Sequence, residues 1–428
     1  MSRRSVPLVL ALAIAAGCGG DVPGPPDHLV LVTVDTLRAD RLGAYGHANA
    51  QTPHLDALAA ESVRFERAYA HSSMTLPSIA SLLTGLLPAE HQIYSNRGSL
   101  RRGVPTFVQA LRTAGFRTAA FLGSYALRPN RRLDRGFEQY TKVFEDREKV
   151  RPQPENRAAT LTDAAIDWLD RLPPDERFAL WIHYQEPHGP YTPESFRPPT
   201  ATGPTLPRSD DHSGRGAIPE YQWLGHGRLP EYLARYDGEV HDTDREVGRL
   251  LDALRARDLY ERSLIVFTAD HGEAFGEDGL YLAHGEGLHE ALLRVPLLLR
   301  APGVAPRVRG DRVRQIDVAP TALALLGVTR DGSRNGRLLL DEVGDRPLVA
   351  QLVLRDERWR SIRDEGLELV TGTDPEVLRS TGDAAEAPAG ARAPLLAELD
   401  RLAPWPVRLS DLLSAEEAEA LRAMGYAN

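Results

Sequence analysis

Apolar residues follow two distinct patterns along the chain. Continuous apolar and β-branched runs are typical of strands buried on both faces of a parallel sheet, and they occupy residues 28–34, 118–122, 178–182 and 264–268. Apolar residues at helical spacing indicate amphipathic helices over residues 53–63, 78–83, 108–114, 158–172 and 232–256. This alternation predicts an α/β fold, an α/β/α sandwich whose sheet is mostly parallel.

The pattern weakens after about residue 327. Strand-like pieces at 348–353 and 367–370 predict a small C-terminal antiparallel sheet, and a capping box predicts a helix over 414–424. We therefore divide the chain into a main domain at 28–330 and a C-terminal α+β subdomain at 331–428.

The N-terminus carries a short apolar run between basic and small residues. Two arginines precede the run 6–16, which leads through small residues to Cys18. The run is shorter than the ~20 residues that a membrane-spanning helix needs. The order resembles a bacterial lipoprotein signal, which predicts a signal peptide at 1–18 and a Pro/Gly-rich linker at 19–27. We expect export to the periplasmic side of the envelope, with membrane contact through a lipid anchor only. A plain secretory signal with an incidental cysteine is the alternative.

Composition excludes several classes of function. The net charge is −9 and there is no basic block, so we expect no nucleic-acid partner. Cys18 is the single cysteine, which leaves no disulfide, thiolate nucleophile or zinc–thiolate site. Lys142 and Lys149 are the only lysines, so mechanisms that need a lysine at a motif elsewhere are excluded.

Two predicted strands end in residues that can bind a metal. Asp35 follows the strand at 28–34, and Asp270 with His271 follows the strand at 264–268. Ligands of open α/β sheets bind beyond the carboxyl ends of the strands. Carboxylates with an imidazole suit a hard-to-borderline metal ion. Each segment also has a structural alternative, a helix cap for Asp35 and an ordinary turn for the Asp-His-Gly sequence.

A hydroxyl group lies at the predicted start of a helix. Pro77 favours the first turn, which places Thr75 just before the helix N-terminus, where the helix dipole favours an anion. A hydroxyl that touches a metal there can attack phosphorus or sulfur. Spacing alone leaves open that Thr75 is only a helix cap.

Short motifs follow one another in a fixed order through the main domain. They read VTVDTLRAD at 32–40, TPHLDALA at 52–59, TLPSIASLLTG at 75–85, EPHGPY at 186–191, YDGEV at 236–240, DHGE at 270–273, LHEALLRVP at 288–296 and DVAPT at 317–321. This series resembles the sulfatase family of the alkaline phosphatase superfamily. The resemblance implies an alkaline phosphatase-like fold and makes 28–330 the catalytic domain.

The resemblance also implies roles for particular residues. Asp35, Asp270 and His271 fall on the family's metal ligands, and Thr75 falls on the nucleophile and supplies a further ligand atom. His188 falls on a histidine that contacts the transferred group or the leaving oxygen, although a purely structural role in a rigid loop is the alternative. Two further histidines near the same loop, His284 and His289, either line the pocket or lie at the surface, and we take His284 as substrate-binding.

The sequence departs from the family where formylglycine sulfatases grip their substrate. Those enzymes carry Cys or Ser at the position of Thr75 and Arg at the position of Ile79. Their Lys and His after one strand correspond to Gly123 and Tyr125, and a further Lys falls closest to Glu286. Formylglycine cannot form from threonine. The chain therefore resembles a threonine-nucleophile variant, which uses one or two divalent ions, with Mn or Zn preferred to Ca.

These features predict a metal-dependent hydrolase that cleaves sulfate or phosphate esters through a covalent threonine intermediate. The substrate would be a small molecule or a glycan or lipid ester. One alternative is a transferase that moves a phospho-group onto envelope glycans or lipids. The other is a non-catalytic binding protein on a degenerate sulfatase scaffold.

Overall fold

The structure is a computed structural model. It describes residues 24–405 except 142–143, 145–155, 200–201, 211–212, 330–334, 343, 355–356, 373–375, 382–386 and 389. The expected signal peptide with Cys18, most of the linker and the expected helix at 414–424 lie outside the described residues. Within the described part of the chain, no helix combines the length and apolarity needed to cross a membrane.

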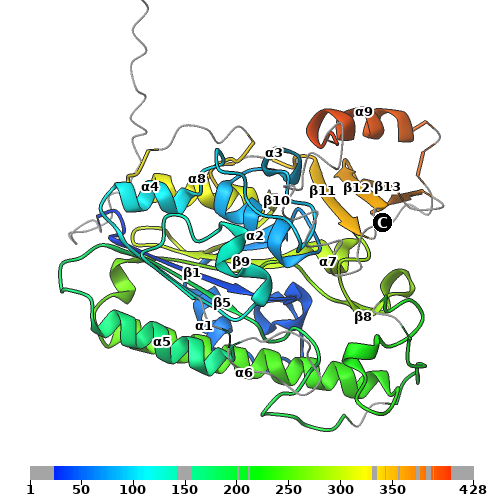
Figure 1. The fold of residues 1–428 in the computed structure, drawn as a ribbon, viewed down its shortest axis with the longest axis horizontal. Coiled ribbons are helices and arrows are strands. Elements are labelled where there is room, and N and C mark those ends of the chain that lie inside the picture. Colours follow the sequence, from blue (N-terminus) through cyan, green and yellow to red (C-terminus); the bar gives the residue numbers. More distant parts are fainter. Residues whose placement is uncertain are drawn as a thin grey trace, which may run out of the picture.

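An eight-stranded sheet forms the centre of the molecule (Figure 1). Its strand order is β10-β2-β9-β6-β1-β5-β3-β4. Neighbouring strands are parallel except where β9 pairs with β2 and with β6, so β9 alone in this sheet runs in the opposite direction. The predicted, mostly parallel sheet is confirmed. The strands are β1 His28–Val34, β2 Val63–Tyr69, β3 Arg117–Leu122, β4 Gln139–Tyr140, β5 Phe178–Tyr184, β6 Ser263–Ala269, β9 Arg294–Arg300 and β10 Arg307–Arg314.

The three central strands β5, β1 and β6 bring the functional segments together. Every residue of these strands is buried, as their continuous apolar runs predict. Because they are parallel, their carboxyl ends meet at one edge of the sheet. Backbone bonds extend the pairing past the strand ends, since Asp35 N–H donates to Tyr184 O at 2.9 Å and Asp270 N–H donates to Val34 O at 3.2 Å.

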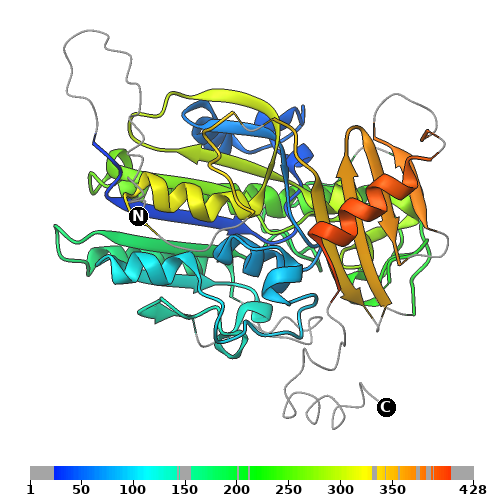
Figure 2. The same cartoon turned by 90° about the horizontal axis from the view of Figure 1, so that it is seen from above.

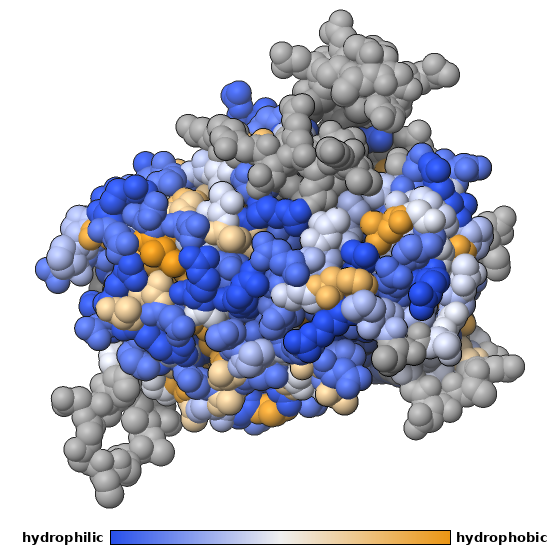
Figure 3. All heavy atoms as spheres, turned by 90° about the horizontal axis from the view of Figure 1, so that it is seen from below, coloured by the Kyte–Doolittle hydropathy of each residue, from blue (hydrophilic) through white to orange (hydrophobic). Residues whose placement is uncertain are grey.

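Helices cover both faces of this sheet (Figure 1). One layer contains α1 Pro53–Ala60, α5 Ala158–Asp170 and α6 Leu229–Arg255, and the other contains α2 Thr75–Thr84, α4 Phe107–Thr113 and α8 Val318–Leu325. The apolar stripe of α6, which includes Val240, Val247 and Leu254, is buried as predicted. The outer surface of the α5–α6 layer is largely hydrophilic, with apolar side chains scattered over it (Figure 3).

The C-terminal part forms the predicted antiparallel sheet, with strand order β11-β12-β13-β14, and α9 lies across it (Figure 2). Its elements are β11 Leu348–Leu354, β12 Glu357–Asp364, β13 Leu367–Thr371, β14 Val377–Ser380 and α9 Arg392–Leu402. The sheet packs on the main domain, where Leu348, Leu352 and Trp359 share an apolar cluster with Leu288 and Leu293. The main domain also contains the short elements α3 Pro88–His91, β7 Ala274–Phe275, β8 Tyr281–Ala283 and α7 Glu290–Leu293.

Two predicted helix boundaries are corrected. The helix expected over 53–63 ends at Ala60, because Val63 already begins β2. The helix expected from Ser78 begins three residues earlier, and Met74 is its N-cap. Thr75 is therefore the first residue of α2 and does not precede the helix.

Candidate active site and metal centre

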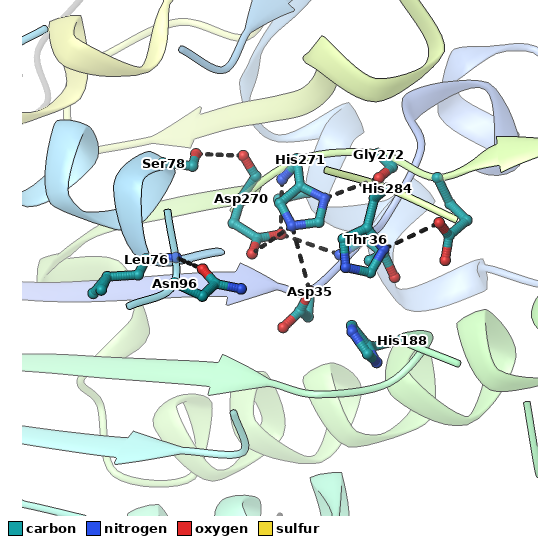
Figure 4. Close-up of polar contacts among 12 residues, drawn as sticks. Asp35, Thr36, Leu76, Ser78, Asn96, His188, Asp270, His271, Gly272 and His284 are labelled. Atoms are coloured by element: carbon teal, nitrogen blue, oxygen red, sulfur yellow. Dashed lines mark hydrogen bonds and ion pairs between the residues drawn. The ribbon is translucent and has the colours of Figure 1, made fainter. Parts of the chain in front are cut away.

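Three fully buried side chains meet where β1 and β6 end. Asp35 follows β1, and Asp270 with His271 follows β6. His271 Nε2 lies 3.4 Å from Asp270 Oδ2 and 3.8 Å from Asp35 Oδ1 (Figure 4). The structure thus brings together the three residues that the resemblance implied as metal ligands.

The hydrogen bonds around these residues fix which atoms face one another. Asp270 Oδ1 accepts the N–H groups of Thr36 and His271, at 3.1 and 2.7 Å. His271 Nδ1 lies 2.9 Å from Gly272 O. A carbonyl oxygen only accepts, so Nδ1 carries the proton and Nε2 presents a lone pair. Burial lowers the pKa of His271 to about 3, which keeps the ring neutral.

When both acids are ionised the facing atoms are all acceptors, and none has a hydrogen-bond partner. Asp35 Oδ1, Asp270 Oδ2 and His271 Nε2 are buried and unpaired. Leaving buried polar atoms unpaired costs about 1–3 kcal/mol each, more where they are charged. Two carboxylate oxygens and an imidazole lone pair at this separation suit a divalent cation, so the residues present fit the metal that the family uses.

The pKa values of the two buried carboxyl groups are displaced in opposite directions. Burial would raise the pKa of Asp35, but His188 and a hydrogen bond from His183 outweigh that effect and hold it below its usual range. Burial and the Asp35 carboxylate raise the pKa of Asp270 well above its usual range. This opposite displacement is expected of two close, buried acids.

Sequence reasoning missed His183, which belongs to β5 and is fully buried. Single ligand atoms of Asp35, His183 and Asp270 lie within 4.8 Å of one another. His183 Nε2 lies 3.4 Å from Asp35 Oδ2. The available signal was a histidine inside an otherwise apolar strand. That strand lies beside the one that ends in Asp35.

The fully buried helix α2 carries the candidate nucleophile to this edge of the sheet. Ser78 donates its hydroxyl proton to Asp270 O at 2.5 Å, which ties the helix to the end of β6. Thr75 lies three residues earlier and therefore on the same helix face, one turn nearer the N-terminus. Asn96, also missed from sequence, accepts the Leu76 N–H at 2.8 Å and lies beside this helix end (Figure 4).

Two histidines line the other side of the site (Figure 4). The ring of His284 lies 4.7 Å from that of His271 and 4.9 Å from that of His188. His284 Nδ1 lies 3.1 Å from Glu273 Oε1, and the buried Glu273 also accepts the Tyr191 hydroxyl. Burial would lower the pKa of His284, but Glu273 raises it. His188 Nδ1 donates to Gly189 O at 2.8 Å.

The positions that hold anion-binding residues in formylglycine sulfatases are filled differently here. Ile79 is fully buried in the core. A Cβ atom on Gly123 would lie 2.8 Å from Gln185 Cβ and 2.9 Å from both Gln185 N and Asn156 O, so a side chain there cannot be accommodated without backbone movement. Glu286 faces Arg215, with 3.6 Å between Oε2 and Nε.

Tyr125, which stands where the formylglycine enzymes carry a histidine, and His289 have other surroundings. Tyr125 is half-buried, with the Arg128 guanidinium 4.3 Å above its ring. His289 is the buried residue that precedes α7. Of the two histidines left open by the sequence, His284 is therefore the one that contacts His271.

Sequence comparison gives a family for this arrangement. The sequence profile of the family described as Sulfatase matches residues 27–328. The chain is 27% identical to a choline-sulfatase of Rhizobium meliloti over 368 residues, which cover 73% of this chain and 69% of that protein. It is 30% identical to human arylsulfatase A over 379 residues, which cover 78% of this chain and 71% of that enzyme.

Solved structures share the fold. A phosphonate monoester hydrolase of Agrobacterium radiobacter superposes with a TM-score of 0.68 at 22% identity, over 93% of this chain and 96% of that one. A protein solved with D-glucosamine-2-N,6-O-disulfate superposes with a TM-score of 0.67 at 19% identity, over 83% and 90% of the two chains. The matched profile spans most of the chain and includes every residue of the site described above. The chain therefore belongs to the sulfatase family and is a sulfatase-like hydrolase of ester bonds.

Proposed function

We propose that this protein cleaves sulfate or phosphate esters through a covalent ester on Thr75, with the help of a divalent metal ion. The observation that carries the proposal is the convergence of three buried, unpaired acceptor atoms on Asp35, Asp270 and His271. Helix α2 is tied to the same point through Ser78, and Thr75 begins that helix on the same face.

The donor set indicates the kind of cation. Asp35, Asp270 and His271 would hold it together with the Thr75 oxygen, giving three oxygen donors and one nitrogen donor. Mn or Zn suits such a mixed set better than Ca, which takes six to eight oxygen ligands. When bound, the cation supplies positive charge that favours ionised Thr75 and neutralises the negative oxygens of the ester.

The side chains have distinct roles in the proposed reaction. Thr75 Oγ1 forms a bond to phosphorus or sulfur as the bond to the leaving oxygen breaks, and its hydroxyl proton passes to solvent. His188 gives a proton to the leaving oxygen or donates a hydrogen bond to a non-bridging oxygen, and His284 binds the substrate beside it. Water then attacks the phosphorus or sulfur atom and releases Thr75.

The charges of the site favour phosphate esters at least as much as sulfate esters. No lysine stands at Gly123 or Glu286, and Ile79 replaces an arginine. The cation would therefore stabilise most of the developing charge. Because the attraction scales with the product of the charges, a doubly charged phosphate monoester gains more from this site than a singly charged sulfate ester.

Small-molecule esters and esters of glycans or lipids are the proposed substrates. The names of two similar proteins refer to choline sulfate hydrolysis and to a disulfated glucosamine. A phospho-group transferase would use the same residues and differ only in the acceptor. Product analysis with and without added alcohols separates these two possibilities, since a transferase forms a new ester in place of the free acid.

Replacement of the proposed nucleophile tests the mechanism. Thr75→Ala should lower kcat by roughly 10³-fold or more, the scale expected for loss of a nucleophile, while the protein remains folded. Thr75→Ser keeps a hydroxyl group and should retain measurable turnover. Rates are measured with p-nitrophenyl sulfate, p-nitrophenyl phosphate and bis(p-nitrophenyl) phosphate, and mass spectrometry of stalled wild-type protein should show the adduct on Thr75. Near-normal turnover by Thr75→Ala would instead indicate direct attack by water.

A further inference from the structure

A chain of buried polar side chains runs from the middle of the sheet to Asp35. Trp181 Nε1 lies 2.9 Å from Thr33 Oγ1, Thr33 Oγ1 lies 2.8 Å from His183 Nδ1, and His183 Nε2 lies 3.4 Å from Asp35 Oδ2. All four residues are essentially inaccessible to solvent. Thr33 and His183 are directly opposite each other in the β1–β5 register, so the backbone holds the contact in place.

The direction of each hydrogen bond follows from the groups at the two ends of this series of side chains, Trp181 and Asp35. The Trp181 indole N–H can only donate, so it occupies an acceptor site of the Thr33 hydroxyl. That hydroxyl has one proton, which can go to His183 Nδ1 at 2.8 Å or to Ile182 O at 3.4 Å. The hydroxyl proton goes to the shorter contact, so His183 Nδ1 accepts this hydrogen bond. His183 Nε2 then carries the ring proton and donates to Asp35 Oδ2.

The opposite tautomer leaves more buried polar atoms without a good hydrogen-bond partner. With the proton on Nδ1, the Thr33 hydroxyl would depend on the 3.4 Å contact to Ile182 O. His183 Nε2 would then point a lone pair at Asp35 Oδ2, and both oxygens of that buried carboxylate would lack a donor, since Oδ1 has no partner in either case. This arrangement would be tolerable only if His183 were itself a metal ligand.

We propose that His183 is a positioning residue, whose Nε2–H holds Asp35 Oδ2 so that Asp35 Oδ1 is presented to the cation, and that Trp181 and Thr33 select the tautomer that does this. The inference rests on the proposed function in that it takes Asp35 as a metal ligand. It removes His183 from the possible ligands, although a lone pair on its Nε2 would lie close enough to the carboxylates to bind. Residues that orient a ligand in this way typically affect metal affinity by about 10–100-fold.

Nitrogen NMR on the full chain reads the tautomer directly. In metal-free wild-type protein with ¹⁵N-labelled histidine, His183 should show a protonated Nε2 and an unprotonated Nδ1, its signals being identified by their loss in His183→Gln. Titration with Zn²⁺ should shift the Nε2 signal of His271 strongly and leave His183 Nε2 protonated. Loss of the His183 Nε2 proton on Zn²⁺ binding would overturn the inference and make His183 a ligand.

Zn²⁺ affinity of variants gives an independent measurement. The side-chain amide of glutamine places an N–H donor close to the position of Nε2, so His183→Gln should stay within a few-fold of wild type, whereas His183→Ala should bind about 10–100-fold more weakly. Thr33→Val, which removes the donor to Nδ1, should weaken binding in the same direction. A His183→Gln variant that binds as poorly as His183→Ala would contradict the positioning role. Wild-type protein that binds no Zn²⁺ or Mn²⁺ at all would overturn the proposed function itself, which distinguishes the two failures.

Discussion

Three unpaired acceptor atoms at the end of β1 and β6 are the proposed metal-binding atoms, so we expect single residues to be decisive for metal binding. Asp270 contributes Oδ2 to this group, while its Oδ1 holds the backbone of Thr36 and of His271. Loss of its side chain removes one ligand and also releases the backbone turn that orients His271. The geometry of the remaining ligands depends on that turn.

Asp270→Ala should therefore abolish both stoichiometric metal content and hydrolysis, because ligand removal leaves too few donors and an unsupported turn. Metal content is measured by elemental analysis of purified protein, with activity assayed on the three chromogenic esters. Asp244→Asn changes a buried carboxylate that binds the backbone of helix α1 and should keep its metal. Full metal occupancy in Asp270→Ala would show that the site lies elsewhere.

Strand ends in the sequence predicted the acidic residues of the site, because parallel strands place their carboxyl ends at one edge. His183 escaped notice because it is an interior strand residue, and such positions are usually occupied by apolar side chains. Asn96 escaped because it lies in a loop that joins no predicted strand end. Its contact with Leu76 N–H depends on tertiary packing that no local pattern encodes.

At the scale of secondary-structure elements, helix α2 connects the proposed nucleophile to the candidate metal site. Two serines of this buried helix make similar hydrogen bonds to different neighbours. Ser78 contacts Asp270 O and Gln315, whereas Ser81 Oγ lies 2.9 Å from His91 Nε2. The pair offers a matched comparison between stability and function.

Ser78→Ala and Ser81→Ala should each lower the free energy of unfolding by about 1–3 kcal/mol, since each leaves a buried partner unsatisfied. Only Ser78→Ala should also lower kcat and metal affinity, because it frees the helix from the end of β6. Urea unfolding and steady-state kinetics are measured side by side. Equal kinetic losses in the two variants would mean that general destabilisation, not alignment of α2, explains the effect.

Helix α1 is held by a carboxylate of α6. Asp244 accepts the N–H groups of His54 and Leu55, and burial raises its pKa from the ordinary 3.8 to about 6. The folded state thus retains a proton on Asp244 that the unfolded state has lost between about pH 4 and pH 6. The contribution of this group to stability is fully present below pH 4 and is lost as the pH rises through 6.

Asp244→Asn should be less stable than wild type near pH 4, because its NH2 group faces one of the two N–H donors, and the difference should shrink as the pH rises to 7.5, because the amide never ionises. Thermal unfolding of both proteins across this range measures the difference. A stability difference that does not shrink between pH 4 and pH 7.5 would show that the ionised carboxylate is well accommodated in the folded protein.

Patterns of apolar residues predicted some strands of the eight-stranded sheet better than others. The buried runs of β1, β3, β5 and β6 were predicted, while β2, β4, β9 and β10 were not. β2 and β10 alternate with arginine and glutamate, since they lie near an edge of the sheet where one side of each strand is partly exposed. Local spacing also misplaced the start of α2, whose first turn is stabilised by packing and by Asn96.

At the scale of the whole molecule, the C-terminal sheet braces the segment that carries His284. Arg379 of β14 pairs with Asp278 at 3.1 Å, and Arg363 of β12 pairs with Glu290. These pairs and the shared apolar cluster around Trp359 surround residues 277–293. The small sheet therefore packs against the segment that carries His284, even though it supplies none of the proposed ligands.

The location of the protein is a separate proposal that rests on the residues before the described part of the chain. We propose that Cys18 is acylated and anchors the exported protein at the periplasmic side of the envelope. Cys18→Ser should move the protein from the membrane fraction to the soluble periplasmic fraction, as measured by fractionation and immunoblotting. Wild-type protein that is fully soluble and retains Met1 would contradict both the anchor and the cleavage.

Gly123 has a consequence for the evolution of this enzyme. Its backbone is packed so closely against Gln185 and Asn156 that any side chain would collide with main-chain atoms. A single mutation to lysine would therefore disturb the edge of the sheet before its amine could reach a sulfate group. A lineage that has adopted this glycine cannot return to lysine-assisted sulfate binding in one step.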